Sequence, residues 1–318
     1  MYPVNGIFCI FVASKTYDMT NPIEGKFNVE VDKDAVLKAV DELKAKAANR
    51  VKTDKEVLKK CLNLIDLTTL NSTDSIERGE LFAQRVNNLQ ENYPQVPNVA
   101  AICVYPSLVS AVKQTLTQSD VKIASVAAGF PASQTFIDIK LSECQMCLDK
   151  GADELDVVIS LGHFLEGDYF TVYSELMQIK EVAGDARVKV ILETGALPTF
   201  SDIRLASFLA MEAGADFIKT STGKIDVAAT PEALYVMCMA AKEYYETTGR
   251  MVGIKPAGGM VTSSDAVLFY SIVEEVLGEK WLNNQWLRLG ASRLADNLLS
   301  DILDDTVKYF SASSSSKY

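Results

Sequence analysis

Two lysines of this sequence each close a short apolar run that is typical of a buried β-strand. Lys219 ends the run DFIK and Lys255 ends the run GIK. A lysine amine attacks a carbonyl carbon only when it is unprotonated, and the pKa of a free lysine is about 10.4. A neighbouring ammonium group and apolar surroundings both lower that pKa. The pair therefore predicts Schiff-base chemistry, in which an iminium ion withdraws electrons and permits C–C cleavage without a metal.

Other polar residues occupy similar positions at or near the ends of apolar runs. These residues are Asp66, Cys103, Asp156 and Glu193, with Lys189 nearer the start of its run and Ser292 just beyond the last one. Charges within such runs are costly to bury and need partners. A purely structural Asp–Lys pair is the alternative, but two lysines and two aspartates at one rim favour a catalytic site.

The histidine content restricts the metal chemistry that is open to this chain. His163 is the only histidine, so one chain cannot supply a zinc site built from three histidines. His163 lies within LGHFLEG, which we interpret as a loop without a catalytic role. We expect neither a metal nor another cofactor.

Glycine-rich segments follow the last predicted strands and favour a phosphate site. KPAGG spans residues 255–259, LGAS spans residues 289–292 and STGK spans residues 221–224. Glycines let backbone amides approach an anion closely, and Ser292 can cap the helix that follows it. STGK is not a Walker A loop, because its glycine spacing differs and Ile225 follows the lysine.

The elements that must position these residues alternate between β-type runs and helical patterns. The predicted strands are 61–67, 99–104, 122–127, 154–160, 188–193, 216–220, 251–255 and 286–289. The predicted helices between them include 107–117, 135–150, 168–182, 199–213 and 231–245. Eight such units over about 250 residues predict an α/β fold, a (β/α)8 TIM barrel, whose active site lies at the carboxyl ends of the strands. A doubly wound sheet is the alternative, but it would be expected to have a G-x-G-x-x-G segment after its first strand, and the sequence contains none.

Segments outside the barrel complete the predicted organisation. We expect a loosely ordered extension over residues 1–32 and N-terminal helices over 33–60. The catalytic barrel then covers 61–310, and a flexible Ser-rich tail covers 311–318. The apolar positions expected on one face of the N-terminal helices are Val36, Leu37, Val40 and Leu43.

Composition excludes several classes of protein. The net charge of −11 argues against a nucleic-acid partner, and no apolar run reaches the roughly 20 residues of a membrane span. The short apolar stretch 6–13 lacks the features of a signal peptide. Six irregularly spaced cysteines argue against a disulfide scaffold, and Cys144 and Cys147 fall in a predicted helix, where we expect them to pack. We expect a cytoplasmic protein.

The motifs resemble those of the deoxyribose-phosphate aldolase family over roughly residues 55–310. The matching segments are IDLTTLN, AAICVYP, GADELDVVIS, KVILETG, GADFIKTSTGK and GIKPAGG. The resemblance implies reversible cleavage of 2-deoxy-D-ribose 5-phosphate to D-glyceraldehyde 3-phosphate and acetaldehyde, in deoxyribonucleoside catabolism. It implies a phosphosugar as partner and leaves homo-oligomer formation open. Another class I phosphosugar aldolase, or a non-catalytic phosphosugar-binding barrel, are the alternatives.

The resemblance also implies a role for each matching residue. Lys219 resembles the Schiff-base lysine, Lys255 the lysine that lowers its pKa, and Asp156 the proton shuttle. Asp66 resembles the residue that holds Lys255, and Lys189 and Cys103 match supporting residues. The residues implied in substrate contact are Thr222 and Lys224 at the sugar hydroxyls, and Gly223, Gly258, Gly259 and Ser292 at the phosphate. Some family members end in a tyrosine that reaches the site, a role implied here for Tyr318.

The sequence departs from the family at the expected phosphate site. Val261 stands where the family usually has an arginine, whereas Arg293 stands where it usually has a serine or threonine. The segment FPASQ, residues 130–134, lacks a common glycine. Because Arg293 would flank the same pocket, we expect it to contact the substrate phosphate or a carboxylate such as Asp296.

Overall fold

The computed structural model describes residues 21–311, which fold around a ring of parallel strands. The strands in this part of the chain are β1 (Ile65–Thr68), β2 (Ala101–Val104), β3 (Lys122–Ala127), β4 (Glu154–Val158), β5 (Arg187–Ile191), β6 (Phe217–Lys219), β7 (Gly253–Lys255) and β8 (Leu289–Ala291). Neighbours pair in parallel in the order β7-β6-β5-β4-β3-β2-β1-β8. Bridges Ile254–Leu287 and Ala257–Gly290 join the two ends. The predicted (β/α)8 TIM barrel is therefore confirmed.

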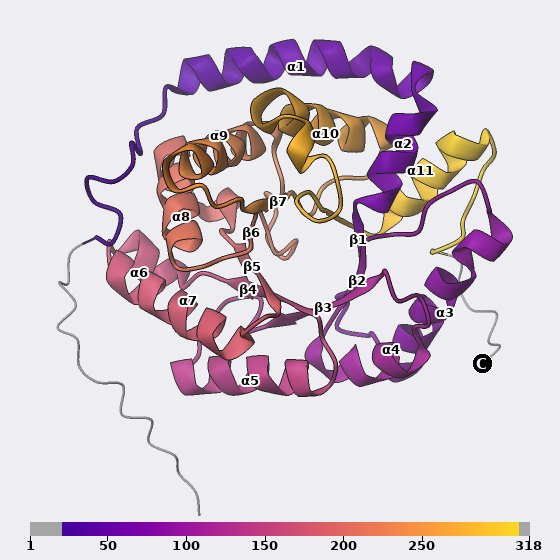
Figure 1. The fold of residues 1–318 in the computed structure, drawn as a ribbon, viewed down its shortest axis with the longest axis horizontal. Helices are drawn as coiled ribbons and strands as arrows, with labels where there is room; N and C mark the ends of the chain where they lie inside the picture. The colour runs from indigo at the N-terminus through magenta and orange to yellow at the C-terminus, as the bar shows by residue number, and fades with distance from the viewer. Residues whose placement is uncertain (1–20, 312–318) are drawn as a thin grey trace, which may run out of the picture.

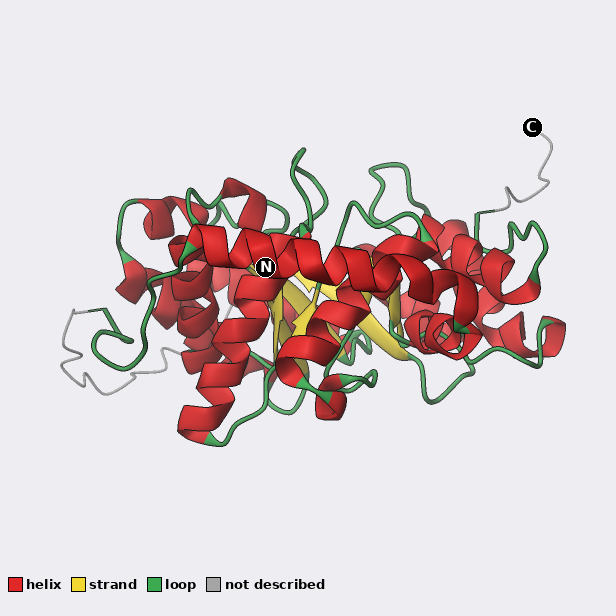
Figure 2. Cartoon of the chain, turned by 90° about the horizontal axis from the view of Figure 1, so that it is seen from above, coloured by secondary structure: helices red, strands yellow, loops and turns green. Residues whose placement is uncertain are grey.

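Helices surround this ring, as the two ribbon views show (Figure 1, Figure 2). They are α1 (Lys33–Thr53), α2 (Lys55–Asn63), α3 (Ile76–Asn92), α4 (Val109–Thr115), α5 (Ile137–Asp149), α6 (Leu161–Leu165), α7 (Tyr169–Ala183), α8 (Phe200–Glu212), α9 (Pro231–Thr248), α10 (Ser263–Leu277) and α11 (Arg293–Leu303). Short 3-10 turns lie at Pro106–Leu108, Thr194–Ala196 and Glu279–Trp281. The five helices that the sequence predicts between strands are all present, with ends that differ by a few residues.

Local signals fix where several helices begin and end. Thr199 and Thr262 form capping boxes at the starts of α8 and α10, in which each threonine and the aspartate three residues later satisfy each other's backbone N–H groups. Gly249 ends α9 with a φ of 74°, in the left-handed region that favours glycine. The helices are thus delimited by their own sequence, and their buried sides face the barrel.

The N-terminal helix α1 lies across α9 and α10, outside the ring of βα units (Figure 1). Val36, Val40 and Leu43 are buried beneath it, but Leu37 is 37% exposed, so the prediction that Leu37 shares their face is wrong. One position along a helix rotates a side chain by about 100°, which turns Leu37 away from the covered stripe. An ion pair of 2.9 Å between Lys44 and Glu232 adds a polar contact to α9.

The segment before α1 also contacts the barrel helices. Phe27 stacks on Phe208 with ring centroids 4.3 Å apart, and Ile23 is 2% exposed. Ile23 and Phe27 therefore pack, whereas most other residues of 21–32 are exposed or half-buried. The remainder of the extension, residues 1–20, and the predicted tail from residue 312 onward lie outside the described residues.

Among the differences from the sequence-based prediction, two concern the starts of strands and one concerns a predicted loop. Helix α2 extends to Asn63, so β1 begins at Ile65 and not near Cys61. β8 begins at Leu289, the last residue of the run 286–289 in which a strand was expected. His163 lies in the short helix α6, not in a loop, where its ring contacts Asp168 at 3.0 Å. The runs that contain the starts of β1 and β8 are short and largely apolar, and such runs do not distinguish a helix turn from a strand.

Two further expectations concern cysteines and membranes. Cys144 and Cys147 lie on α5 with exposures of 0% and 1%, which confirms that they pack inside the helix layer. Over residues 21–311, no helix combines the length and the apolar character that crossing a membrane requires.

Candidate active site

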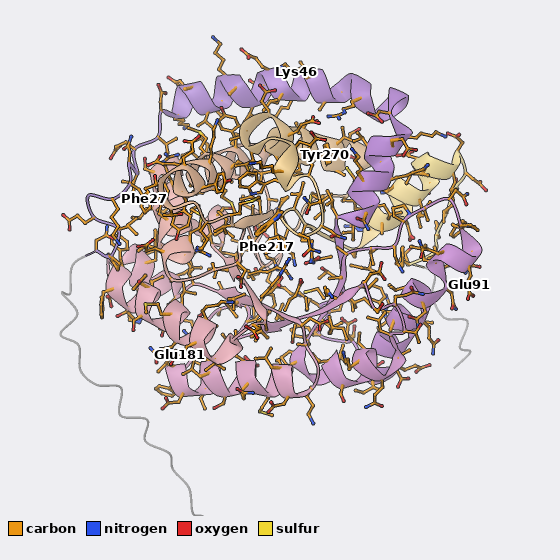
Figure 3. All side chains as sticks on the ribbon, in the orientation of Figure 1. Phe27, Lys46, Glu91, Glu181, Phe217 and Tyr270 are labelled. Atoms are coloured by element: carbon orange, nitrogen blue, oxygen red, sulfur yellow. The ribbon has the colours of Figure 1, made fainter. Side chains whose placement is uncertain are left out.

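Side chains of alternate strand residues point into the barrel, because successive residues of a β-strand face opposite sides. β4 thereby places Glu154 and Asp156 on its inner face. The parallel register sets Asp156 beside Lys189, and Lys219 beside Lys255. Figure 3 shows Phe217, two residues before Lys219, near the centre of the molecule, whereas Lys46 and Glu181 lie at its periphery. The predicted lysines and aspartates therefore converge inside the barrel.

Asp156 joins the three predicted lysines. Its Oδ2 atom lies 2.7 Å from the Nζ atom of Lys219 and 2.7 Å from that of Lys255. Its Oδ1 atom lies 2.9 Å from the Nζ atom of Lys189. Asp66 contacts Lys255 at 2.5 Å, as the resemblance implies, and also Lys189 at 3.2 Å. One carboxylate thus lies within hydrogen-bond distance of both candidate catalytic lysines and can exchange a proton with either.

Two residues that sequence reasoning missed complete this network. Arg288 contacts Asp66 at 2.6 Å and Glu154 at 2.8 Å, and Glu154 contacts Lys189 at 2.6 Å. We call the whole set the charged floor; it comprises Asp66, Glu154, Asp156, Lys189, Lys219, Lys255 and Arg288. All seven side chains are at least 96% buried. The signal that could have revealed Glu154 is its two-residue spacing from Asp156, which puts both on one strand face.

The charge balance of the floor favours an unprotonated lysine. Four cationic side chains face three carboxylates, an excess of one positive charge if all are ionised. Burial lowers the pKa of Lys219, the ammonium of Lys255 lowers it further, and Asp156 opposes both effects without reversing them. Loss of one proton from Lys219 would bring the buried network to neutrality.

The pKa shifts of the other floor residues favour their ionised forms. Burial alone would lower the pKa of Lys255, but Asp156 and Asp66 raise it above its usual value. Burial would raise the pKa of Asp156, but Lys189, Lys219 and Lys255 together hold it well below its usual range. Lys219 is thus the lysine poised to act as an amine, and Lys255 the one that remains an ammonium.

A cavity of about 530 Å³ opens above Lys219. The predicted substrate residues that line it are Thr222, Gly223, Lys224, Gly258, Gly259, Ser292 and Arg293. No Asp or Glu is among its described lining residues, which include Arg78 and Asn71. Cys103 does not line the cavity and is fully buried, and burial raises the pKa of its thiol. The cavity therefore offers cations and backbone amides to an anion.

Close backbone approach explains two glycines of this cavity. Gly258 has a φ of 77°, and a Cβ atom on it would lie 2.9 Å from the Cβ atom of Ala228 and 3.3 Å from Gly223. A Cβ atom on Gly290 would lie 2.7 Å from the Cβ atom of Ala257 and 3.2 Å from Cε of Lys255. Only glycine lets the loops after β6, β7 and β8 meet here and lets Lys255 extend beneath them.

Glu193 fixes the loop after β6. The backbone N–H of Thr222 donates to the Glu193 carboxylate at 3.0 Å, and the Thr222 hydroxyl donates to the same group. The backbone N–H of Lys224 donates to the Thr222 hydroxyl at 3.0 Å, and its ammonium donates to the carbonyl of Leu70. Thr222 and Lys224 are thereby held at the cavity wall, on the loop that follows Lys219.

The start of α11 differs in part from the prediction. Ser292 occupies the cap position, but its side chain makes no capping hydrogen bond, so that expectation is wrong; its backbone is in the helical region and not in the extended conformation that capping favours. Arg293 forms no ion pair with Asp296 in the described structure. The two Asp296 oxygens accept the backbone N–H groups of Phe310 at 2.7 Å and Ser311 at 2.9 Å. Phe310 and Ser311 line the cavity as well. Tyr318 lies outside the described residues.

Over positions 21–311, no group of three or more His, Cys, Asp or Glu side chains is arranged to hold a metal ion. His163 lies on α6, and its side chain is about half exposed. Among the described residues, its ring nitrogen contacts the side chain of Asp168.

Comparison with known proteins identifies the family of this chain. The model of the DeoC/LacD family of aldolases matches residues 60–279. A protein of Caenorhabditis elegans is 39% identical over 275 residues, covering 86% of this chain and 90% of its own. The deoxyribose-phosphate aldolase of Homo sapiens is 37% identical over 284 residues, covering 86% of this chain and 88% of its own.

Solved structures give the same result. The deoxyribose phosphate aldolase of Aeropyrum pernix, described as a unique tetrameric structure, superposes with a TM-score of 0.61 at 25% identity, covering 81% of this chain and 96% of its own. The resemblance read from the motifs is thereby confirmed. With its parallel barrel and the matched span of residues 60–279, this chain belongs to the DeoC/LacD family of aldolases and is a lyase.

Proposed function

We propose that this aldolase reversibly cleaves 2-deoxy-D-ribose 5-phosphate to D-glyceraldehyde 3-phosphate and acetaldehyde through a Schiff base on Lys219. The observation that carries the proposal is the placement of Lys219, a buried lysine with a lowered pKa at the bottom of a cavity whose described lining holds no carboxylate. The names of the relatives support the substrate. A role in deoxyribonucleoside catabolism follows from that substrate.

The reaction begins when the Lys219 amine attacks C1 of the open-chain aldehyde. Loss of water gives an iminium ion, which accepts the electron pair of the C2–C3 bond as that bond breaks. The C3 hydroxyl loses its proton and becomes the aldehyde of glyceraldehyde 3-phosphate. The remaining enamine gains a proton at C2, and water then releases acetaldehyde and restores the amine.

Asp156 and Lys255 serve the proton transfers in this scheme. The Asp156 carboxylate contacts both lysines at 2.7 Å, so it can accept a proton on the substrate side, through a water, and exchange it with the Lys255 ammonium. Asp66 and Lys189 hold these groups in place through the contacts of the charged floor. Cys103 is a neutral neighbour of this network.

Phosphate binding falls to the opposite side of the cavity. Gly223, Gly259 and Ser292 offer backbone N–H groups there. The backbone N–H of Gly258 donates to the carbonyl of Gly290 at 3.1 Å, so Gly258 serves by its lack of a side chain, which would close the gap between two of the loops. Thr222 and Lys224 face the sugar. A barrel commonly binds phosphate at the loops after its seventh and eighth strands.

Tyr318 is the proposed proton donor and acceptor at C2. Ser311 lines the cavity, and Tyr318 follows it seven positions later in the chain. A chain of that length reaches about 25 Å at about 3.3–3.6 Å per residue, which is ample to bring a phenol to the site.

Borohydride trapping tests the proposal. Incubation with acetaldehyde and sodium borohydride should leave an ethyl group on Lys219, identified by peptide mass spectrometry. Lys219→Leu should abolish both labelling and aldolase activity, whereas Lys242→Leu, at an exposed lysine of α9, should alter neither. Labelling mainly on Lys255 would reverse the assignment of the two lysines. A panel of phosphosugars decides whether deoxyribose 5-phosphate is the preferred substrate.

A further inference from the structure

Arg78 lines the cavity on the side of β1, and no family motif includes it. It lies in the first turn of α3, three residues after the N-cap Ser75, whose hydroxyl accepts its backbone N–H at 3.2 Å. Its guanidinium lies over the ring of Phe82, 5.8 Å from the centroid. Phe82 lines the same cavity and is 3% exposed, so this contact orients the arginine at the cavity wall.

The charge of Arg78 has no counterpart in the described structure. Among residues 21–311, no Asp or Glu lies within ion-pair distance of its guanidinium, and none lines the cavity. A cation in the first turn of a helix is also unfavourable toward the helix dipole. Burial and the positive charge of Arg78 lower the pKa of Arg85, which lies seven residues further along α3. The position is therefore electrostatically costly unless an anion enters the cavity.

The contact with Phe82 leaves the hydrogen-bonding edge of Arg78 available. Stacking on an aromatic ring engages the face of a guanidinium, whereas its five N–H donors lie in its plane. A guanidinium edge matches two oxygens of a phosphate group with two parallel charge-assisted hydrogen bonds. The same cavity contains the glycine loops that offer backbone amides and the exposed Arg293.

We propose that Arg78 is a specificity-determining residue that binds the phosphate of the substrate and selects phosphorylated over unphosphorylated sugars. The proposal rests on the proposed function, since it names a further contact of the same substrate. It assigns the phosphate to a site with charge on two sides, the loops after β7 and β8 and the first turn of α3. Arg78 thereby supplies charge that Val261 cannot.

Substrate discrimination tests this role in the full-length enzyme. Arg78→Gln should raise the Michaelis constant for deoxyribose 5-phosphate about tenfold, equivalent to about 1.4 kcal/mol, while leaving cleavage of unphosphorylated deoxyribose unchanged. Arg78→Lys should recover part of the loss, because it keeps the charge but not the two-pronged geometry. Lys150→Gln removes the same charge at the opposite end of the barrel, after α5, and should change neither constant.

Three outcomes would overturn the assignment. An equal effect of Arg78→Gln on both sugars would make Arg78 a structural partner of Phe82. An equal effect of Lys150→Gln would attribute the change to net charge. Calorimetric titration with inorganic phosphate gives a readout that needs no turnover, and equal binding by the parent enzyme and Arg78→Gln would exclude phosphate contact. If neither sugar is cleaved by the parent enzyme, the proposed function fails while this titration still decides the role of Arg78.

Discussion

The charged floor and the cavity above it differ in how their cationic side chains are paired and buried. In the floor, Lys189, Lys255 and Arg288 each contact at least two carboxylates and are almost fully buried. Around the cavity, Arg78 and Arg293 are more exposed and have no carboxylate partner among the described residues. Paired, buried charges control which group carries a proton. Unpaired charges at an opening remain available to bind an anion.

A matched pair of arginines tests this contrast in stability. Arg288→Met should lower the free energy of unfolding by about 3–5 kcal/mol, because it leaves buried Asp66 and Glu154 without a partner. Arg293→Met should change it by no more than about 0.5 kcal/mol, as expected for an exposed position. Urea unfolding of both variants measures the difference. Equal losses would mean that the floor and the cavity do not differ in this respect.

The proton balance of the floor is tested by the pH dependence of Lys255→Met. Removal of the Lys255 ammonium leaves Asp156 as the main charge beside Lys219, so the pKa of Lys219 should rise. Less amine is then present at neutral pH, and turnover should fall on the order of a thousandfold and recover in part as the pH increases. Lys255→Arg keeps the charge, so the pH below which the rate of borohydride trapping falls should stay near that of the parent enzyme. If that pH is also unchanged in Lys255→Met, the charge-balance argument is contradicted.

The proposed role of the C-terminal Tyr318 is proton transfer at the reacting carbon, between the cavity and the charged floor. Asp296 holds the preceding residues Phe310 and Ser311 at the cavity. Deletion of Tyr318 should slow turnover on the order of a hundredfold, because a general acid–base group is lost. Borohydride trapping should remain intact, since Schiff-base formation needs only the floor. A turnover number equal to that of the full-length enzyme would leave Tyr318 without a catalytic role.

The smallest expected effect concerns Arg293. Arg293→Ser should raise the Michaelis constant for deoxyribose 5-phosphate about tenfold, for about 1.4 kcal/mol of lost binding, and barely change cleavage of unphosphorylated deoxyribose. Kinetics with the two sugars make the measurement. If both constants move together, or neither moves, the backbone amides of Gly259 and Ser292 bind the phosphate without Arg293.

The site residues that could be predicted from the sequence are those that lie in segments with a recognisable pattern. Lys219 and Lys255 end short apolar runs followed by glycine-rich loops, and the barrel brings such strand ends together. Glu154 and Arg288 lie at or before the starts of their strands, and from sequence alone an acidic or basic residue there resembles an ordinary solvent-facing end. Arg78 belongs to a helix whose distance from the cavity depends on packing.

The barrel itself was predictable because its period of strand and helix recurs along the chain. The ends of the elements were less so, as β1 and β8 show. In CLNLIDL, helix and strand share one apolar run, and only tertiary pairing with β2 and β8 decides that the strand starts at Ile65. The missing side-chain cap of Ser292 likewise depends on the local backbone angles, which the residue type does not determine.

Helix α1 has a consequence for how the molecule opens. It contacts α9 and α10 from outside, whereas the ring of strands closes through β7 and β8 without it. Cooperative units of a protein open at different free energies, and the central strands are among the last to open, whereas α1 packs on helices and not on the strands. We therefore expect the amides of α1 to exchange with deuterium through an opening that leaves β6 and β7 protected, so that the N-terminal helix can detach while the catalytic lysines stay in place.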